Sequence, residues 1–140
     1  MGAQNLLVDQ QSYAVEQSLG ASSSEIYDQA IHILKGNSIN SGMLLDVGAG
    51  VGHFISALKK ETHFSLSAVD LMHTNMPDVR WYVQDLNRNL QFKNETFNVV
   101  SCLEVVEHLE NPRKLIRDIF RVLEPGGYAV LSTPKDRKST

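Results

Sequence analysis

The chain has 140 residues, with 13 lysines and arginines against 16 aspartates and glutamates, for a formal net charge of −3. This length suits one compact domain with its own core. The acidic balance argues against a surface that binds the phosphate backbone of duplex nucleic acid. The single cysteine, Cys102, excludes an internal disulfide and a multi-cysteine zinc site. No segment is long and apolar enough to span a bilayer, so we expect a cytoplasmic domain without a membrane partner.

The first third of the chain contains one well-defined helix. Residues 1–21 are polar, rich in glutamine and serine and only weakly periodic, which predicts a flexible N-terminal arm. The stretch SSSEIYDQAIHILKG then predicts a helix over residues 24–35. Ser22 and Glu25 have the spacing of a capping box at its start, and Gly36 suits its C-terminal end.

Short apolar runs alternate with amphipathic stretches over the rest of the chain. The runs that predict strands are MLLDV (43–47), FSLSAVD (64–70), RWYVQD (80–85), FNVVSCL (97–103) and GYAVLST (127–133). Helices are predicted for HFISALKK (53–60) and for PRKLIRDIFRVL (112–123), which has Pro112 at its start. This alternation predicts an α/β fold with a mainly parallel sheet covered by helices on both faces.

Three glycines follow the first of these strands, in the stretch LLDVGAGVGHF (44–54). Gly48, Gly50 and Gly52 allow a tight turn and a close approach to a ligand, and the helix that follows offers unpaired N–H groups. In a parallel α/β sheet, ligands bind at the carboxyl ends of the strands, where this loop begins. A dinucleotide fingerprint would need its third glycine at His53, and no Gly-Lys-Ser/Thr follows. The spacing therefore disfavours a nicotinamide dinucleotide and excludes a P-loop.

Five stretches in order resemble motifs of the class I S-adenosylmethionine-dependent methyltransferases. They are LLDVGAGVGHF (44–54), AVDLM (68–72), VQDLN (83–87), FNVVSCLEVVEHLENP (97–112) and RVLEPGGYAVLSTP (121–134). The resemblance extends over residues 43–134 and implies a Rossmann-like doubly wound sheet of strand order 3-2-1-4-5, with S-adenosyl-L-methionine as cofactor. Members of this family usually have a sixth and a seventh strand, which are missing here. We predict a methyltransferase core over residues 22–134 and a disordered tail over residues 135–140.

The resemblance also implies roles for the carboxylates in these motifs. Asp70 would accept bonds from both ribose hydroxyls, Asp85 from the adenine amino group, and Asp46 would lie near the methionyl ammonium. The Leu86 amide would donate to an adenine ring nitrogen. A strand-end turn is the alternative role for Asp70, and core packing is the alternative for the apolar residues after it. The expected cofactor-binding residues are Asp46, Gly48, Ala49, Gly50, Gly52, Asp70, Leu71, Met72, Asp85, Leu86, Cys102 and Leu103.

The stretch EVVEHLENP, residues 104–112, leaves three interpretations open. Its E-x-x-E-H spacing resembles that of methyltransferases of ubiquinone biosynthesis and of small-RNA 3'-end methylation, where Glu104, Glu107 and His108 would bind a divalent cation. His108 would otherwise be a general base, because the unperturbed pKa of histidine lies near neutrality. The third interpretation is a helical turn that covers the cofactor without a metal. We take His108 as the candidate catalytic residue and expect no metal.

The resemblance implies an enzyme that transfers a methyl group to a small-molecule acceptor. Methyl transfer is an in-line displacement, so the protein has mainly to align the acceptor and remove its proton. The missing strands suggest an alternative, a truncated or noncatalytic cofactor-binding module that acts with a partner or within a larger enzyme. They would also expose the edge of the fifth strand, which self-association into a homo-oligomer or the N-terminal arm would then cover.

Overall fold

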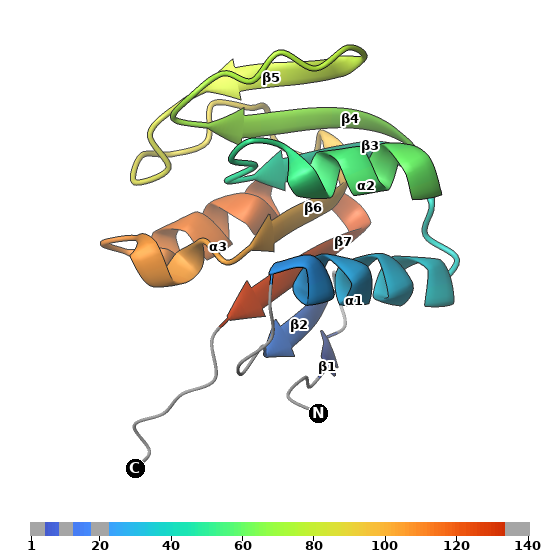
Figure 1. Cartoon of the computed structure of the whole chain (residues 1–140). Helices are drawn as coiled ribbons and strands as arrows, with labels where there is room; N and C mark the ends of the chain where they lie inside the picture. The colour runs from blue at the N-terminus through green and yellow to red at the C-terminus, as the bar shows by residue number, and fades with distance from the viewer. Residues whose placement is uncertain (1–4, 9–12, 18–22, 134–140) are drawn as a thin grey trace.

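The computed structural model describes residues 5–8, 13–17 and 23–133, which form one sheet with helices on both faces (Figure 1). The strands are β1 (Asn5–Val8), β2 (Tyr13–Gln17), β3 (Ser41–Val47), β4 (His63–Asp70), β5 (Val79–Val83), β6 (Phe97–Leu103) and β7 (Leu123–Thr133). The helices are α1 (Ser23–Gly36), α2 (His53–Glu61), the short 3-10 helix η1 (Val106–His108) and α3 (Pro112–Val122). None of the helices in these ranges has the length and apolar character needed to cross a lipid bilayer.

The sheet has the strand order β1-β2-β7-β6-β3-β4-β5, and Figure 1 shows it from β5 at the top to β1 at the bottom. The pairs from β7 to β5 are all parallel. Numbered from β3 onward, these five strands have the order 3-2-1-4-5, which confirms the predicted fold. The order reverses at β3, whose neighbours are β4 and β6, so the loop after β3 lies at the crevice where such sheets bind ligands.

Two apolar cores cover the two faces of the sheet. Successive side chains of a strand point to opposite faces, so Leu44 packs with α1 and α2 while Leu45 packs with α3. Leu34 of α1 and Ile119 of α3 are fully buried on these two sides. Because both faces are covered, the central strands are continuous apolar runs rather than alternating ones, as the sequence indicated.

The structure differs from the flexible arm predicted over residues 1–21. β2 pairs in parallel with β7, from Tyr13 opposite Ala129 to Gln17 opposite Thr133, and β1 pairs antiparallel with β2. An open sheet edge offers unpaired backbone groups to any segment that can extend along it, whatever the polarity of its side chains. Of the two expected covers for the edge of β7, a second copy of the chain or the N-terminal arm, the structure has the second, since β2 pairs with β7. The tail predicted over residues 135–140 lies outside the described residues.

Candidate functional site

The loop after β3 turns across the carboxyl edge of the sheet. Gly48, Gly50 and Gly52 have φ angles of 80°, 61° and 93°, a region that favours glycine. A Cβ at Gly48 would overlap Val105 Cγ2, and a Cβ at Gly52 would lie 2.8 Å from Met76 Cε. At Gly50 a Cβ would meet nothing within 4 Å. Conformation favours glycine at all three positions, and packing against Val105 adds to this at Gly48, whereas at Gly52 the close atom is the end of the flexible Met76 side chain. Gly50 borders open space.

Asp70 ends β4 and is hydrogen-bonded to this loop. Its Oδ2 accepts from the Gly50 amide at 2.5 Å, and its Oδ1 accepts from the Leu71 amide at 2.6 Å. Thr74 Oγ1 donates to the Gly50 carbonyl at 3.2 Å, so the two loops are joined in both directions. Each carboxylate oxygen has two lone pairs, and both oxygens keep the capacity to accept from a ligand. The role of Asp70 in the turn is therefore compatible with a role in binding.

Asp46 is the buried carboxylate of β3. It is 3% exposed, and its Oδ1 accepts from Ser101 Oγ at 2.8 Å. Burial raises the pKa of Asp46 to about 7; the Ser101 hydrogen bond opposes this shift, and the nearby Asp70 carboxylate adds to it. No lysine, arginine or histidine of the described residues forms an ion pair with Asp46. A ligand cation beside it would favour its ionised form.

The first turn of α1 reaches the same edge of the sheet. Ser23 Oγ donates to Glu104 Oε1 at 2.7 Å, and the Glu104 amide donates to Ser132 Oγ at 2.8 Å. Burial raises the pKa of Tyr27, and the Asp46 and Glu104 carboxylates raise it further. Ser23 and Tyr27 are four residues apart and so share one face of α1. Sequence reasoning missed both, because their spacing reveals a common face but not what that face contacts.

The residues expected to contact adenine lie beyond β4 and β5. Leu71 and Met72 are 62% and 74% exposed, so core packing, the alternative left open for them, is wrong. Asp85 follows β5 in an exposed turn, where its Oδ1 accepts from the Asn87 amide at 2.9 Å. Leu86 is partly buried against the core on the α3 side.

Cys102 and Leu103 end β6 with buried side chains. Burial raises the pKa of the Cys102 thiol, followed by smaller effects of the Asp46 and Glu107 carboxylates. A thiol is a nucleophile only as a thiolate, so the expectation that Cys102 is a core residue rather than a nucleophile agrees with its environment. With both side chains buried, backbone atoms are what these two residues offer to a ligand.

Within EVVEH, Glu104 has different contacts from Glu107 and His108. Glu104 contacts Ser23, while His108 Nε2 lies 3.8 Å from Glu107 Oε2 at the surface, with the His108 side chain 75% exposed. Within the described ranges, no group of three His, Cys, Asp or Glu residues could hold a metal ion. The segment after Val105 forms η1, the kind of helical turn that the third interpretation expected. The structure therefore offers no assembled metal site at Glu104, Glu107 and His108.

The comparisons with known proteins point to one family. A family model described as a methyltransferase domain matches residues 23–139. The ubiquinone biosynthesis O-methyltransferase of Rickettsia typhi is 31% identical over 106 residues, a match that covers 69% of this chain and 43% of that protein. The chain thus spans less than half the length of the curated relatives that it matches.

Solved structures support the same fold. A Methanococcus maripaludis protein described as an S-adenosyl-L-methionine-dependent methyltransferase superposes with a TM-score of 0.66 and 23% identity, over 78% of this chain and 56% of that one. The phosphoethanolamine N-methyltransferase 2 of Haemonchus contortus, in complex with phosphomonomethylethanolamine and S-adenosylhomocysteine, superposes with a TM-score of 0.62 and 27% identity. That match covers 74% of this chain and 28% of the other.

Proposed function

Since the chain belongs to the class I S-adenosylmethionine-dependent methyltransferases, whose cofactor is S-adenosyl-L-methionine, we propose that it transfers a methyl group from this cofactor to a small-molecule acceptor. The observation that carries the proposal is the hydrogen bond of 2.5 Å between the Gly50 amide and Asp70 Oδ2. It joins the glycine loop to the carboxylate at the carboxyl edge of the sheet, where the crevice opens. A cofactor with a vicinal diol and no phosphate suits this arrangement.

The chemistry of the other residues at this edge fits the same cofactor. In the proposal, Asp70 accepts from the ribose hydroxyls, and the open space beside Gly50 lets the backbone approach the methionyl part. Asp46, buried without a cationic partner in the described part of the chain, faces the methionyl ammonium. The exposed side chains of Leu71 and Met72 become buried against the adenine ring.

The remaining residues of the proposed cofactor set act mainly through their backbone. Ala49 belongs to the glycine loop, and its amide donates to the Val69 carbonyl at 3.4 Å. In the proposal, Cys102 and Leu103 contribute main-chain atoms to the cofactor site, since their side chains are buried.

Few side chains are needed for the reaction itself. When bound, the cofactor supplies a methyl group that its sulfonium has already activated, so the chain has to align the acceptor and accept a proton from it. We assign the proton to His108, whose imidazole lies at the surface beside Glu107. No metal takes part in the proposed mechanism.

A hydroxyl group of a small phenolic compound is the proposed acceptor. The Rickettsia relatives are named ubiquinone biosynthesis O-methyltransferases, which supports an oxygen acceptor rather than duplex nucleic acid. A cytoplasmic location belongs to the same proposal and agrees with a lone buried cysteine, Cys102.

A second candidate function follows from the length of the match. The chain covers 43% of the Rickettsia typhi enzyme, so it supplies fewer residues than that relative for an acceptor site. It would then bind the cofactor without turnover of its own, as a module that acts with a partner chain or within a larger enzyme.

Binding and turnover are tested in two steps. Isothermal titration with S-adenosyl-L-methionine and, separately, with NAD is expected to show saturable heat for the first compound alone. Transfer of an isotopically labelled methyl group to a panel of phenols is then expected above the level of a heat-denatured control. Binding without transfer would favour the module, and saturable heat with NAD but not with S-adenosyl-L-methionine would contradict both candidates.

A further inference from the structure

We propose that Arg121 and Asp118 of α3 are positioning residues for the adenine part of the site. They bond to the β5–β6 loop, residues 84–96, whose first residues include Asp85 and Leu86. The inference rests on the proposed function, in which these two residues contact the base. Arg121 and Asp118 are not proposed to contact the cofactor themselves; they contact the loop that carries Asp85 and Leu86.

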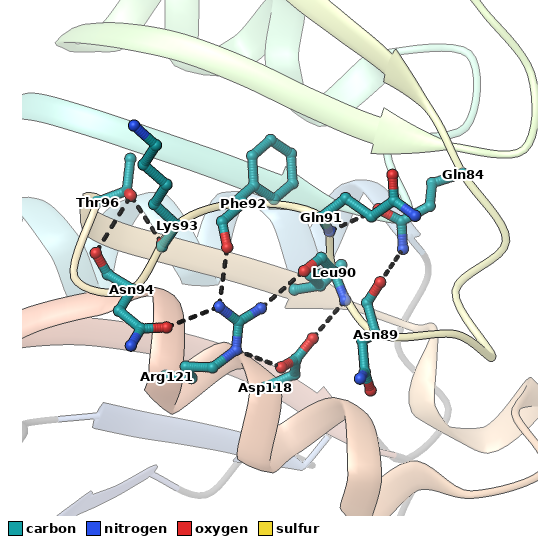
Figure 2. Close-up of polar contacts among 10 residues, drawn as sticks. All are labelled: Gln84, Asn89, Leu90, Gln91, Phe92, Lys93, Asn94, Thr96, Asp118 and Arg121. Carbon is teal, nitrogen blue, oxygen red and sulfur yellow. Dashed lines mark hydrogen bonds and ion pairs between the residues drawn. The ribbon is translucent and has the colours of Figure 1, made fainter.

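The guanidinium of Arg121 is hydrogen-bonded to the second half of this loop, at residues 90, 92 and 94 (Figure 2). Its Nη2 donates to the Leu90 carbonyl at 2.7 Å, and its Nη1 donates to the Phe92 carbonyl at 2.8 Å and to Asn94 Oδ1 at 2.9 Å. Its Nε donates to Asp118 Oδ1 at 2.7 Å. These four acceptors match the planar, forked donors of arginine, which the ammonium of lysine does not reproduce.

Asp118 completes the contact from the same helix. Its Oδ2 accepts from the Leu90 amide, while its other oxygen orients Arg121. Leu90 therefore has its amide bonded to one side chain of α3 and its carbonyl bonded to the other. We call this arrangement of Asp118, Arg121 and Leu90 the Leu90 clamp. Leu90 is 2% exposed and Asp118 is 9% exposed, whereas the Arg121 side chain is 34% exposed, so the clamp is buried on its Leu90 and Asp118 side only.

Gln84 connects the clamp to the residues that would contact adenine, as Figure 2 also shows. Its Nε2 donates to the Asn89 carbonyl at 2.8 Å, and its Oε1 accepts from the Gln91 amide at 3.0 Å. Asn89 and Gln91 are the two neighbours of the clamped residue, and Gln84 directly precedes Asp85. The Gln84 amide also donates to the Asp70 carbonyl at 2.9 Å, which ties this end of the loop to β4.

The loop has no helix or strand to define its shape, so its conformation depends on bonds of this kind. Besides the clamp and the Gln84 bonds there is a second attachment at Asn87, whose Oδ1 accepts from the Glu110 amide at 3.0 Å and whose carbonyl accepts from Lys114 Nζ at 3.2 Å. Long irregular segments sample several conformations unless side chains fix them. Loss of the clamp would release Leu90 and its neighbours, and through the Gln84 bonds it is expected to increase the mobility of Asp85 and Leu86 while the Asn87 contacts remain. The residues that we propose for the ribose and methionyl parts lie at the ends of β3 and β4, and they would keep their positions. Loss of the clamp is thus expected to weaken recognition of the adenine base and to leave binding of the ribose and methionyl parts unchanged.

The test compares two ligands that differ in the base alone. S-adenosylhomocysteine carries the 6-amino group and the unprotonated ring nitrogen that Asp85 and Leu86 are proposed to recognise, whereas S-inosylhomocysteine carries a 6-oxo group and a protonated nitrogen. Calorimetry on the full chain is expected to give wild-type protein a clear preference for the adenosyl compound. In Arg121→Ala that preference falls about tenfold, the equivalent of one hydrogen bond, because affinity for the adenosyl compound drops alone.

Two further variants distinguish the loss of the clamp from a loss of folding. Arg121→Lys keeps the charge and the aliphatic stem, and an intermediate preference is expected from it. Arg117→Ala removes an exposed arginine from the same helix and is expected to behave as wild type. A clamp variant that remains folded and keeps the full preference for the adenosyl compound would overturn the inference, and so would an equal loss of affinity for both ligands.

Hydrogen exchange without ligand separates this inference from the proposed function. Faster exchange of amides 85–91 in Arg121→Ala, but not in Arg117→Ala, is expected if the clamp orders the loop, and unchanged exchange would overturn the clamp. Wild-type protein that binds neither ligand would contradict the proposed function and the adenine role of the clamp together, whatever the exchange result.

Discussion

Asp70 Oδ2 and the Gly50 amide are 2.5 Å apart, so the last residue of β4 is bonded to the middle of the loop that follows β3. The ends of two strands that are neighbours in the sheet are thereby joined at its carboxyl edge, where we propose that the cofactor binds. The bond explains why the glycine loop and the acidic end of the next strand act as a unit. It also means that a change at either residue alters both the loop and the carboxylate.

Asp70→Ala is expected to weaken the binding of S-adenosylhomocysteine by about 1.5 to 3 kcal/mol, through the loss of hydrogen bonds to a charged acceptor. Asp70→Asn keeps one oxygen acceptor and is expected to lose less. Titration calorimetry measures both, and thermal unfolding of each variant without ligand checks for damage to the loop. Wild-type affinity in Asp70→Ala would remove this carboxylate from the site.

Gly50→Leu is expected to abolish measurable binding, because its side chain would extend into the open space that we assign to the cofactor. Gly50 also has a φ of 61°, so any side chain there costs about 1 kcal/mol of stability. Gly36→Leu is the matched control, since a Cβ at Gly36 likewise meets nothing within 4 Å and its φ is not positive. Equal ligand affinity in the two leucine variants would place the cofactor elsewhere.

The buried Asp46 predicts a specific dependence of stability on pH. Its pKa is raised from 3.8 to about 7 in the folded protein, so the folded state binds more protons than the unfolded chain between these values. The stability contributed by protonated Asp46 is present below pH 3.8 and is lost as the pH rises through about 7. The free energy of unfolding, measured by urea titration, is expected to be lower at pH 8 than at pH 5 because of Asp46.

Asp46→Asn is the control for this effect, because an amide is neutral at both pH values and can still accept from Ser101. The difference between pH 5 and pH 8 is expected to shrink by a few kcal/mol at most in this variant. An unchanged difference would mean that Asp46 does not titrate in this range.

Strands β3, β4, β6 and β7 were predictable because they are apolar runs buried in the sheet, and β5 was predictable from its β-branched and aromatic residues although it forms an exposed edge. Leu44 and Leu45 illustrate the reason, since adjacent residues of β3 pack into different cores and both must be apolar. The loop after β3 was predictable for a similar local reason, because three positive φ angles within five residues require glycine. The strand order came from the resemblance to the methyltransferase family.

Contacts between distant segments were not predictable in this way. Ser23 and Glu104 are 81 positions apart in sequence, and neither lies in a local pattern that indicates the other. The same holds for the Leu90 clamp and for the position and register of β2 along β7, although a cover of this edge by the N-terminal segment was one of the two expected. Backbone pairing leaves no periodic signal in the side chains when a strand lies near the edge of a sheet.

Glu104 has a φ of 60°, a left-handed conformation that costs a non-glycine residue about 1 kcal/mol, and it lies where β6 meets the proposed site. Strain of this kind persists at functional positions when neighbouring contacts stabilise it, here the bonds to Ser23 and Ser132. Glu95 has a φ of 54° and lies in the β5–β6 loop, so it provides a matched comparison. Both residues are candidates for replacement by glycine.

Glu95→Gly is expected to raise the stability by up to about 1 kcal/mol and to leave ligand affinity unchanged, because glycine relieves strain there without removing a contact to the site. Glu104→Gly relieves the same strain but removes the acceptor for Ser23, so α1 loses its bond to the edge of the sheet. We expect no net gain in stability and weaker binding of S-adenosylhomocysteine. Thermal unfolding measures the stability of the two variants, and calorimetry measures their affinity for S-adenosylhomocysteine. Equal changes in stability and in affinity would show that the conformation of Glu104 serves no binding role.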